Sequence, residues 1–239
     1  MKKEYWIILL VYIAMQFSSF IGIPALVWIF KNAGINRGLS VPIWLLISFS
    51  IALIIILFIL RKDSDRSDVR KKSPFSISFM WAFLGVFLAL FSQYVAAIIE
   101  QMLGIQPGSE NTQDILNIID VLPLTMIVTS IIGPILEEIV FRKVIFGSLY
   151  KRFNFLISGL LSSVIFAAAH MEFEHIILYS AMGLTFAFLY VKTNRIIVPI
   201  FAHVAMNTLV VLVQLVFRED IERLQRNLDA MQNFIGGFL

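Results

Sequence analysis

The sequence contains no cysteine. This absence excludes disulfide bonds, a thiolate nucleophile and metal sites that use cysteine. Charged residues are also scarce: they make up 15% of the 239 residues, whereas soluble domains average about 25%. Hydrophobic residues make up 59% of the chain, above the roughly 45–50% of soluble domains. The composition therefore predicts an integral membrane protein.

Seven segments are apolar enough, or nearly so, to cross a bilayer, which takes about 20 mostly hydrophobic residues. They are residues 5–30, 41–60, 75–99, 121–150, 155–170, 176–191 and 196–217. We predict an all-α membrane protein, with a bundle of about seven transmembrane helices, or eight, and an amphipathic C-terminal helix. The whole chain forms a single membrane domain, divided into N-terminal spans (1–120), core spans (121–217) and an amphipathic tail (218–239).

The net charge of +3 is explained by membrane topology, and we expect no nucleic acid as a partner. Lysine and arginine lie in residues 61–72, 143–152 and 192–195, whereas residues 100–120 and 171–175 contain neither. Because basic loops stay in the cytoplasm, this alternation predicts a multi-pass protein of the cell membrane with a cytoplasmic N-terminus.

Three charged residues lie within six positions in the middle of one apolar segment: Glu137, Glu138 and Arg142. A charged side chain near the bilayer centre costs roughly 2.5–3.5 kcal/mol on insertion scales. These three side chains therefore need an internal polar site. Glu138 and Arg142 are four residues apart and can pair along one helix face. Glu137 is turned about 100° from Glu138, so we expect it to face a cavity.

Other polar residues in the core spans can share that cavity. Phe166 and His170 are four residues apart, as are His203 and Asn207, so each pair lies on one helix face. A carboxylate and two imidazoles around a water molecule suit general base chemistry. Asn207 can orient a histidine or donate a hydrogen bond to an oxyanion.

The residues alone leave several alternatives open. Glu137, His170 and His203 match the ligand set of a catalytic zinc, and a metal-free site is equally compatible with them. Serine chemistry at Ser162 or Ser163 fits less well because no Gly-x-Ser-x-Gly elbow is present. A transporter with a proton relay would also place ionisable groups inside the membrane.

Two further expectations concern the surroundings of His175 and the depth of His170 and His203 in the membrane. His175 lies beside Glu172 and Glu174 and is expected to be solvated surface. At about 1.5 Å rise per residue, straight helices would leave His170 and His203 at different depths. A shared site therefore requires tilted or kinked helices.

Three sequence motifs carry a resemblance to a known family. They are Glu137-Glu138-Ile139-Val140-Phe141-Arg142, Phe166-Ala167-Ala168-Ala169-His170 and His203-Val204-Ala205-Met206-Asn207. In this order and spacing the sequence resembles the CPBP family, which comprises CAAX prenyl endopeptidases and bacteriocin-processing or bacteriocin-immunity (Abi) proteins. The resemblance covers about residues 125–210.

The resemblance implies a CAAX-type intramembrane endopeptidase that acts on membrane-associated or lipidated peptide substrates in contact with membrane lipid. Glu137 would activate water with help from His170, while His203 and Asn207 would stabilise the oxyanion. Glu138, Arg142 and Phe166 would give structural support. A divalent metal such as zinc stays open, because the family has been labelled both metalloprotease and glutamate protease. The alternative is a non-enzymatic membrane scaffold or bacteriocin-immunity protein.

Overall fold

The computed structural model describes residues 1–62, 72–218, 220 and 223. Within this part of the chain the regular elements are helices and no strand is present, as the sequence predicts. The longer helices are α1 (Lys3–Ala33), α2 (Ser40–Lys62), α3 (Phe75–Met102), α4 (Glu110–Val121), α8 (Phe155–Ala169), α9 (Ile176–Thr193) and α10 (Ile197–Val216). Two short 3-10 turns also occur, η1 (Arg37–Leu39) and η4 (Phe173–His175).

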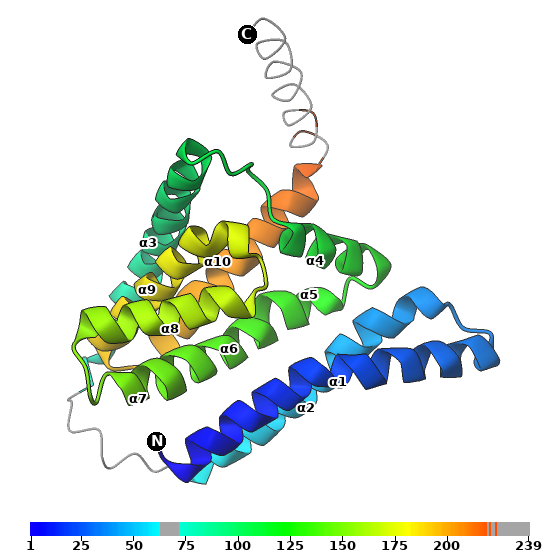
Figure 1. Ribbon diagram of the computed structural model, residues 1–239, viewed down its shortest axis with the longest axis horizontal. Helices are drawn as coiled ribbons and strands as arrows, with labels where there is room; N and C mark the ends of the chain where they lie inside the picture. The colour runs from blue at the N-terminus through cyan, green and yellow to red at the C-terminus, as the bar shows by residue number, and fades with distance from the viewer. Residues whose placement is uncertain (63–71, 219, 221–222, 224–239) are drawn as a thin grey trace, which may run out of the picture.

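The helices form two groups in Figure 1. Helices α1 and α2 lie side by side as a hairpin. Helix α9 packs against α3, α8 and α10 in the second group. The two groups meet through the segment that carries the paired glutamates, because α1 and α2 both contact it.

The segment with the paired glutamates is helical almost throughout, but it is not a uniform α-helix. It consists of α5 (Thr125–Ile127), η2 (Val128–Ile132), α6 (Gly133–Glu137), η3 (Glu138–Phe146) and α7 (Gly147–Leu149), and both η2 and η3 are π-type turns. Pro134 cannot donate a hydrogen bond to the carbonyl of Ser130, so the ordinary ladder is interrupted there. Such π-type turns occur frequently at functional sites.

Among the described residues, five helices are long and apolar enough to cross a membrane: α1, the segment 37–61 that covers most of α2, α3, the segment 173–193 that contains α9, and α10. Helix α8 is apolar but has only 15 residues. The segment 121–150 is divided as described above. The structure thus supports a multi-pass helical protein, while the count of seven or eight spans stays a prediction.

The sequence predicts a loop over residues 100–120, but the structure contains helix α4 there. Ser109 caps its first turn, because its Oγ accepts a hydrogen bond from the Thr112 amide at 3.1 Å. The helix buries Leu116 and Ile119. The predicted amphipathic tail, 218–239, falls almost entirely outside the described residues.

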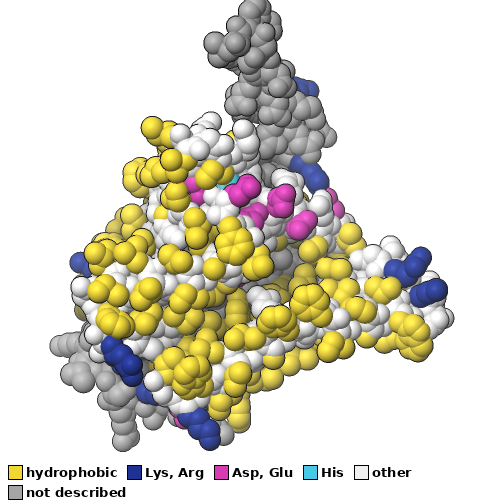
Figure 2. Space-filling view, in the orientation of Figure 1, with side chains coloured by type: hydrophobic (Ala, Val, Ile, Leu, Met, Phe, Trp, Pro, Cys, Tyr) yellow, Lys and Arg dark blue, Asp and Glu magenta, His cyan; other side chains and the backbone are white. Residues whose placement is uncertain are grey.

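Hydrophobic side chains cover most of the face shown in Figure 2. On this face most acidic side chains lie apart from most basic ones. Acidic side chains gather in the upper part of that view, around α4. A hollow there is lined by Glu110, Asp114, Glu172 and Glu174, together with Arg218. Most basic side chains in the view lie away from this end.

Candidate active site

The buried pair of Glu138 and Arg142 lies at the centre of the bundle. Arg142 Nε lies 3.2 Å from Glu138 Oε2, and neither side chain has any exposed area. The guanidinium carbon lies 4.4 Å from the ring centroid of Phe166 and 5.4 Å from that of Phe186. The four-residue spacing therefore predicted this ion pair correctly, and two aromatic faces add to its support through cation–π contacts.

His203 of α10 lies between the two glutamates. Its Nδ1 lies 3.0 Å from Glu138 Oε1, and its Nε2 lies 3.7 Å from Glu137 Oε2. The imidazole also stacks on Phe186, with ring centroids 4.5 Å apart and an angle of 20°. Glu138 thus has a second contact that the sequence did not suggest: it holds His203 as well as Arg142. A carboxylate on one ring nitrogen fixes the orientation of the imidazole.

Glu137 is less enclosed than Glu138. Its side chain is 20% exposed, whereas that of Glu138 is wholly buried. It ends α6, and Glu138 begins the π-type turn η3, so the two side chains leave the helix in different directions. The expected difference between the two carboxylates is therefore present in the structure.

His170 lies directly after the end of α8, beside Phe166. Its Nδ1 lies 2.9 Å from the Phe166 carbonyl oxygen, within hydrogen-bond distance. The Phe166 ring lies 4.6 Å from the His170 ring and 6.1 Å from the His203 ring, measured between centroids. The two histidines therefore flank one phenylalanine. Convergence is possible because α8 is short and α10 passes at an angle to it in Figure 1.

A cavity of about 290 Å³ connects several of the predicted residues. Its lining includes His170, His203 and Asn207, together with the apolar side chains of Met182 and Met206. The expectation that Glu137 faces this shared cavity does not hold: Glu137 does not line it, and its Oε2 lies 3.7 Å from Nε2 of His203, which does. The structure therefore brings His203 to both glutamates, and brings both histidines and Asn207 to one cavity.

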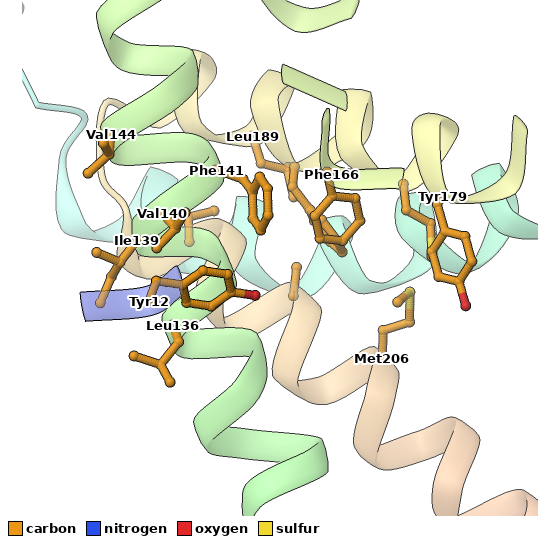
Figure 3. Close-up of a cluster of buried hydrophobic side chains, with 14 of the residues drawn as sticks. Tyr12, Leu136, Ile139, Val140, Phe141, Val144, Phe166, Tyr179, Leu189 and Met206 are labelled. Carbon is orange, nitrogen blue, oxygen red and sulfur yellow. The ribbon is translucent and has the colours of Figure 1, made fainter. Parts of the chain in front are cut away.

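A buried cluster of hydrophobic side chains supports this site (Figure 3). Phe141 packs edge-on against Phe166, with centroids 5.1 Å apart and an angle of 80°. Tyr12 of α1 packs against the other side of this cluster, with its ring 6.0 Å from that of Phe141. The first helix, which the sequence showed only as a hydrophobic span, thus contributes a side chain beside the site.

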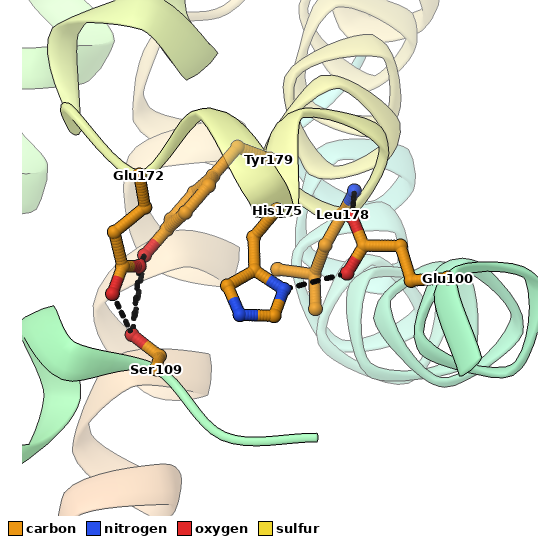
Figure 4. A network of polar contacts seen from close by, with 6 residues as sticks. All are labelled: Glu100, Ser109, Glu172, His175, Leu178 and Tyr179. Atoms are coloured by element: carbon orange, nitrogen blue, oxygen red, sulfur yellow. Dashed lines mark hydrogen bonds and ion pairs between the residues drawn. The ribbon is translucent and has the colours of Figure 1, made fainter. Parts of the chain in front are cut away.

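The expectation for His175 is wrong. Its side chain is only 12% exposed, and its Nδ1 lies 2.7 Å from Glu100 Oε2. The other Glu100 oxygen accepts the Leu178 amide at 2.9 Å, so Glu100 also caps the start of α9 (Figure 4). Glu100 lies 75 residues from His175 in the sequence, so local spacing does not indicate this contact.

A second network around Glu172 was also missed. Its carboxylate accepts hydrogen bonds from Ser109 Oγ at 2.8 Å and from the Tyr179 hydroxyl at 2.5 Å (Figure 4). It also accepts one from the Asn111 amide at 2.7 Å. Burial acts to raise the pKa of the Glu172 carboxyl, but these donors outweigh it, so the pKa lies below its ordinary value. The capping position of Ser109 was the one local signal in the sequence that pointed to this region.

Whether the site binds a metal stays a prediction. In the described part of the chain, no three His, Asp or Glu side chains already lie together as a set of metal ligands. Nδ1 of His170 and Nδ1 of His203 lie against Phe166 O and Glu138 Oε1, an arrangement that leaves Nε2 of each ring as the nitrogen able to bind a metal.

Comparisons with known proteins agree with the motifs. Residues 120–209, which include the motifs with both glutamates and both site histidines, match the model of the type II CAAX prenyl endopeptidase Rce1-like family. The chain is 49% identical over 247 residues to the membrane peptidase YdiL of Bacillus subtilis (strain 168), with 99% of each chain covered. It is 35% identical over 223 residues to the membrane-embedded CAAX protease MroQ of Staphylococcus aureus (strain USA300), with 90% of each chain covered.

No solved structure matches the chain. The family model and the two relatives nevertheless agree with the polar site inside an apolar helical bundle. The chain therefore belongs to the family of Rce1-like CAAX prenyl endopeptidases and is a membrane peptidase of the CAAX protease type.

Proposed function

We propose that this peptidase hydrolyses membrane-associated or lipidated peptides with water activated by Glu137. The position of His203 carries this proposal. Its Nδ1 lies 3.0 Å from Glu138 Oε1, and its Nε2 lies 3.7 Å from Glu137 Oε2. His203 also lines a cavity together with His170 and Asn207. A carboxylate held next to an imidazole in a largely apolar bundle is suited to proton transfer.

In the proposed step, the water oxygen attacks the carbonyl carbon of the scissile bond while Glu137 accepts one water proton. His170 assists by orienting that water. The carbonyl oxygen becomes an oxyanion. In this step His203 is doubly protonated: its Nδ1–H donates to Glu138, while its Nε2–H and the side-chain amide of Asn207 donate to the oxyanion. As the C–N bond breaks, the proton held by Glu137 passes to the leaving nitrogen, so the products are a carboxylic acid and an amine.

Glu138, Arg142 and Phe166 would act by holding these groups. Glu138 contacts Nδ1 of His203 and so directs Nε2 of the ring towards the reacting atoms. Arg142 balances the charge of Glu138 and lies on the Phe166 ring. Phe166 separates the two histidines at fixed distances. Each of these contacts supports preorganisation, which lowers the cost of reaching the transition state.

The cavity indicates the kind of substrate. Polar groups of His170, His203 and Asn207 face the same space as Met182 and Met206. An extended peptide with a hydrophobic side chain or a lipid near its scissile bond fits such a lining. Prenylated tails, peptide pheromones and bacteriocin precursors are the substrate classes we propose.

We further propose that the N-terminus is cytoplasmic and that α4 lies on the outer side of the cell membrane. The connection from α3 through α4 has no lysine or arginine between residues 100 and 120.

Comparison of membrane-associated peptides between cells with the intact protein and cells with Glu137→Gln tests the proposed reaction. We expect uncleaved precursors to accumulate in the variant, with the variant protein present at normal levels in the membrane. Glu174→Gln, which changes an exposed acid, is the control and should leave the peptide pattern unchanged. Identical patterns in all three strains would contradict the proposal and favour a scaffold.

Metal analysis of the purified protein, combined with chelator treatment, tests the metal-free step. We expect cleavage of an accumulated precursor to continue after treatment with 1,10-phenanthroline. Loss of cleavage that is restored by added zinc would overturn this part of the proposal.

A further inference from the structure

Tyr179 makes two contacts that the proposed chemistry does not use. Its ring stacks on that of His170, with centroids 4.1 Å apart and an angle of 25°. Its hydroxyl donates to Glu172 Oε2 at 2.5 Å (Figure 4). Tyr179 is only 6% exposed, and it belongs to none of the three motifs. One side chain thus connects a proposed catalytic histidine to a carboxylate outside the site.

His170 needs such a contact because its own attachment is limited. It follows the end of α8, and the polar contact that the structure shows for it is that of Nδ1 with the Phe166 carbonyl oxygen. One hydrogen bond fixes one ring nitrogen but leaves the imidazole free to tilt about that bond. Phe166 meets the ring at 67°, and Tyr179 covers its face at 25°. The stacking therefore sets the plane of the imidazole.

Glu172 in turn holds Tyr179 and connects it to α4. Ser109 Oγ and the Asn111 amide donate to the same carboxylate. Between His170 and Glu172 the chain turns through Met171, whose φ of 60° lies in the left-handed region that a non-glycine residue rarely adopts. A strained turn persists only when its surroundings fix it, and the three donors to Glu172 supply that constraint.

We propose that Tyr179 is a positioning residue for His170, and that Glu172 secures Tyr179 to the start of α4. In this role Tyr179 acts through its ring on the histidine, and it does not touch the reacting atoms. The inference rests on the proposed function, because it assigns a role to the residue that keeps His170 in its working orientation. It also predicts that the Ser109–Asn111 turn and His170 are coupled.

The test compares three variants of the full chain in lipid nanodiscs: Tyr179→Leu, which removes the stacking; Tyr179→Phe, which keeps the ring but not the hydroxyl; and Glu172→Gln. The rate of cleavage of an accumulated precursor is measured. We expect Tyr179→Leu to lower kcat by about tenfold to a hundredfold, as misplacement of a catalytic group does, with KM changed less than about twofold. Tyr179→Phe and Glu172→Gln should show smaller losses. Tyr190→Leu, which removes a different tyrosine of α9, controls for loss of an aromatic side chain.

A second readout does not depend on activity. With ¹³C-labelled histidine, the His170 resonance is assigned through His170→Gln, and its shift reports the stacked tyrosine ring. We expect this shift to change strongly in Tyr179→Leu and little in Tyr179→Phe. An unchanged resonance and unchanged kcat in Tyr179→Leu would overturn the proposal. If His170→Gln cleaves normally while Tyr179→Leu still moves the resonance, the proposed catalytic role of His170 fails and the contact itself stands.

Discussion

At the residue scale, the site depends on a charge pair that is wholly buried. Glu138 contacts Arg142 on one oxygen and His203 on the other. Burying two charges gains stability only when each finds its partner, and removing one partner leaves the other uncompensated. The structural pair and the proposed catalytic histidine are therefore one unit, and damage to the pair should also disturb catalysis.

Replacement of Arg142 by leucine tests the importance of this pair. We expect Arg142→Leu to lower the free energy of unfolding by about 3–5 kcal/mol, because Glu138 stays buried without its counter-ion. Unfolding in mixed micelles measures the change. The double variant with Glu138→Gln removes both charges and should recover a large part of the loss. A single variant as stable as the wild type would contradict the assigned pairing.

At the scale of the helices, His170 directly follows α8 and Tyr179 lies in α9, so the spacing between these two helices matters. They approach closely at Gly183: a Cβ atom there would lie 2.8 Å from Ser163 Cβ and 3.0 Å from its Cα. Small residues at such crossings let membrane helices pack closely. A methyl group at this position has to separate the two helices.

Gly183→Ala is therefore expected to destabilise the protein by about 1–3 kcal/mol, the usual cost of overpacking. It should also reduce kcat, because it shifts His170 relative to Tyr179. Thermal unfolding and cleavage of the same precursor measure the two effects. The double variant Ser163→Gly with Gly183→Ala has more room where the two helices cross. It should therefore recover part of the lost stability and part of the lost kcat. Equal activity and stability in Gly183→Ala and wild type would exclude tight packing there.

The helices show what the sequence could and could not predict. Length and hydrophobicity sufficed to locate the apolar helices, since a bilayer requires long runs whose backbone groups bond internally. The π-type turns at η2 and η3 could not be predicted, because hydrophobicity does not distinguish a helix that bonds residues four apart from one that bonds residues five apart. Helix α4 has a cap at Ser109 and apolar positions at Leu116 and Ile119, but its hydrophobicity is too low to stand out among spans.

Sequence spacing predicted those contacts of the site that join residues four positions apart. Positions four apart gave the pairing of Glu138 with Arg142 and the facing of Phe166 with His170. Contacts between distant segments do not follow from spacing. Glu100 with His175, and the stacking of Tyr179 on His170, depend on how α3, α8 and α9 cross, which is a property of the folded bundle.

At the scale of the whole molecule, the proposed orientation predicts which residues are accessible from outside the cell. Because the chain has no cysteine, single cysteines introduced at Asn117 in α4 and at Lys151 beyond α7 can be labelled selectively. We expect an impermeant maleimide to label Asn117→Cys in intact cells and Lys151→Cys only after lysis. The reverse pattern would invert the topology.

The central claim is that Glu137 activates the water that cleaves the peptide. Its most direct test is the rate at which the reconstituted protein hydrolyses a fluorogenic form of an accumulated precursor. We predict that Glu137→Gln lowers kcat by at least about 100-fold, the usual contribution of a general base, while Glu174→Gln keeps the wild-type rate. Cleavage by folded Glu137→Gln at the wild-type rate would contradict the claim.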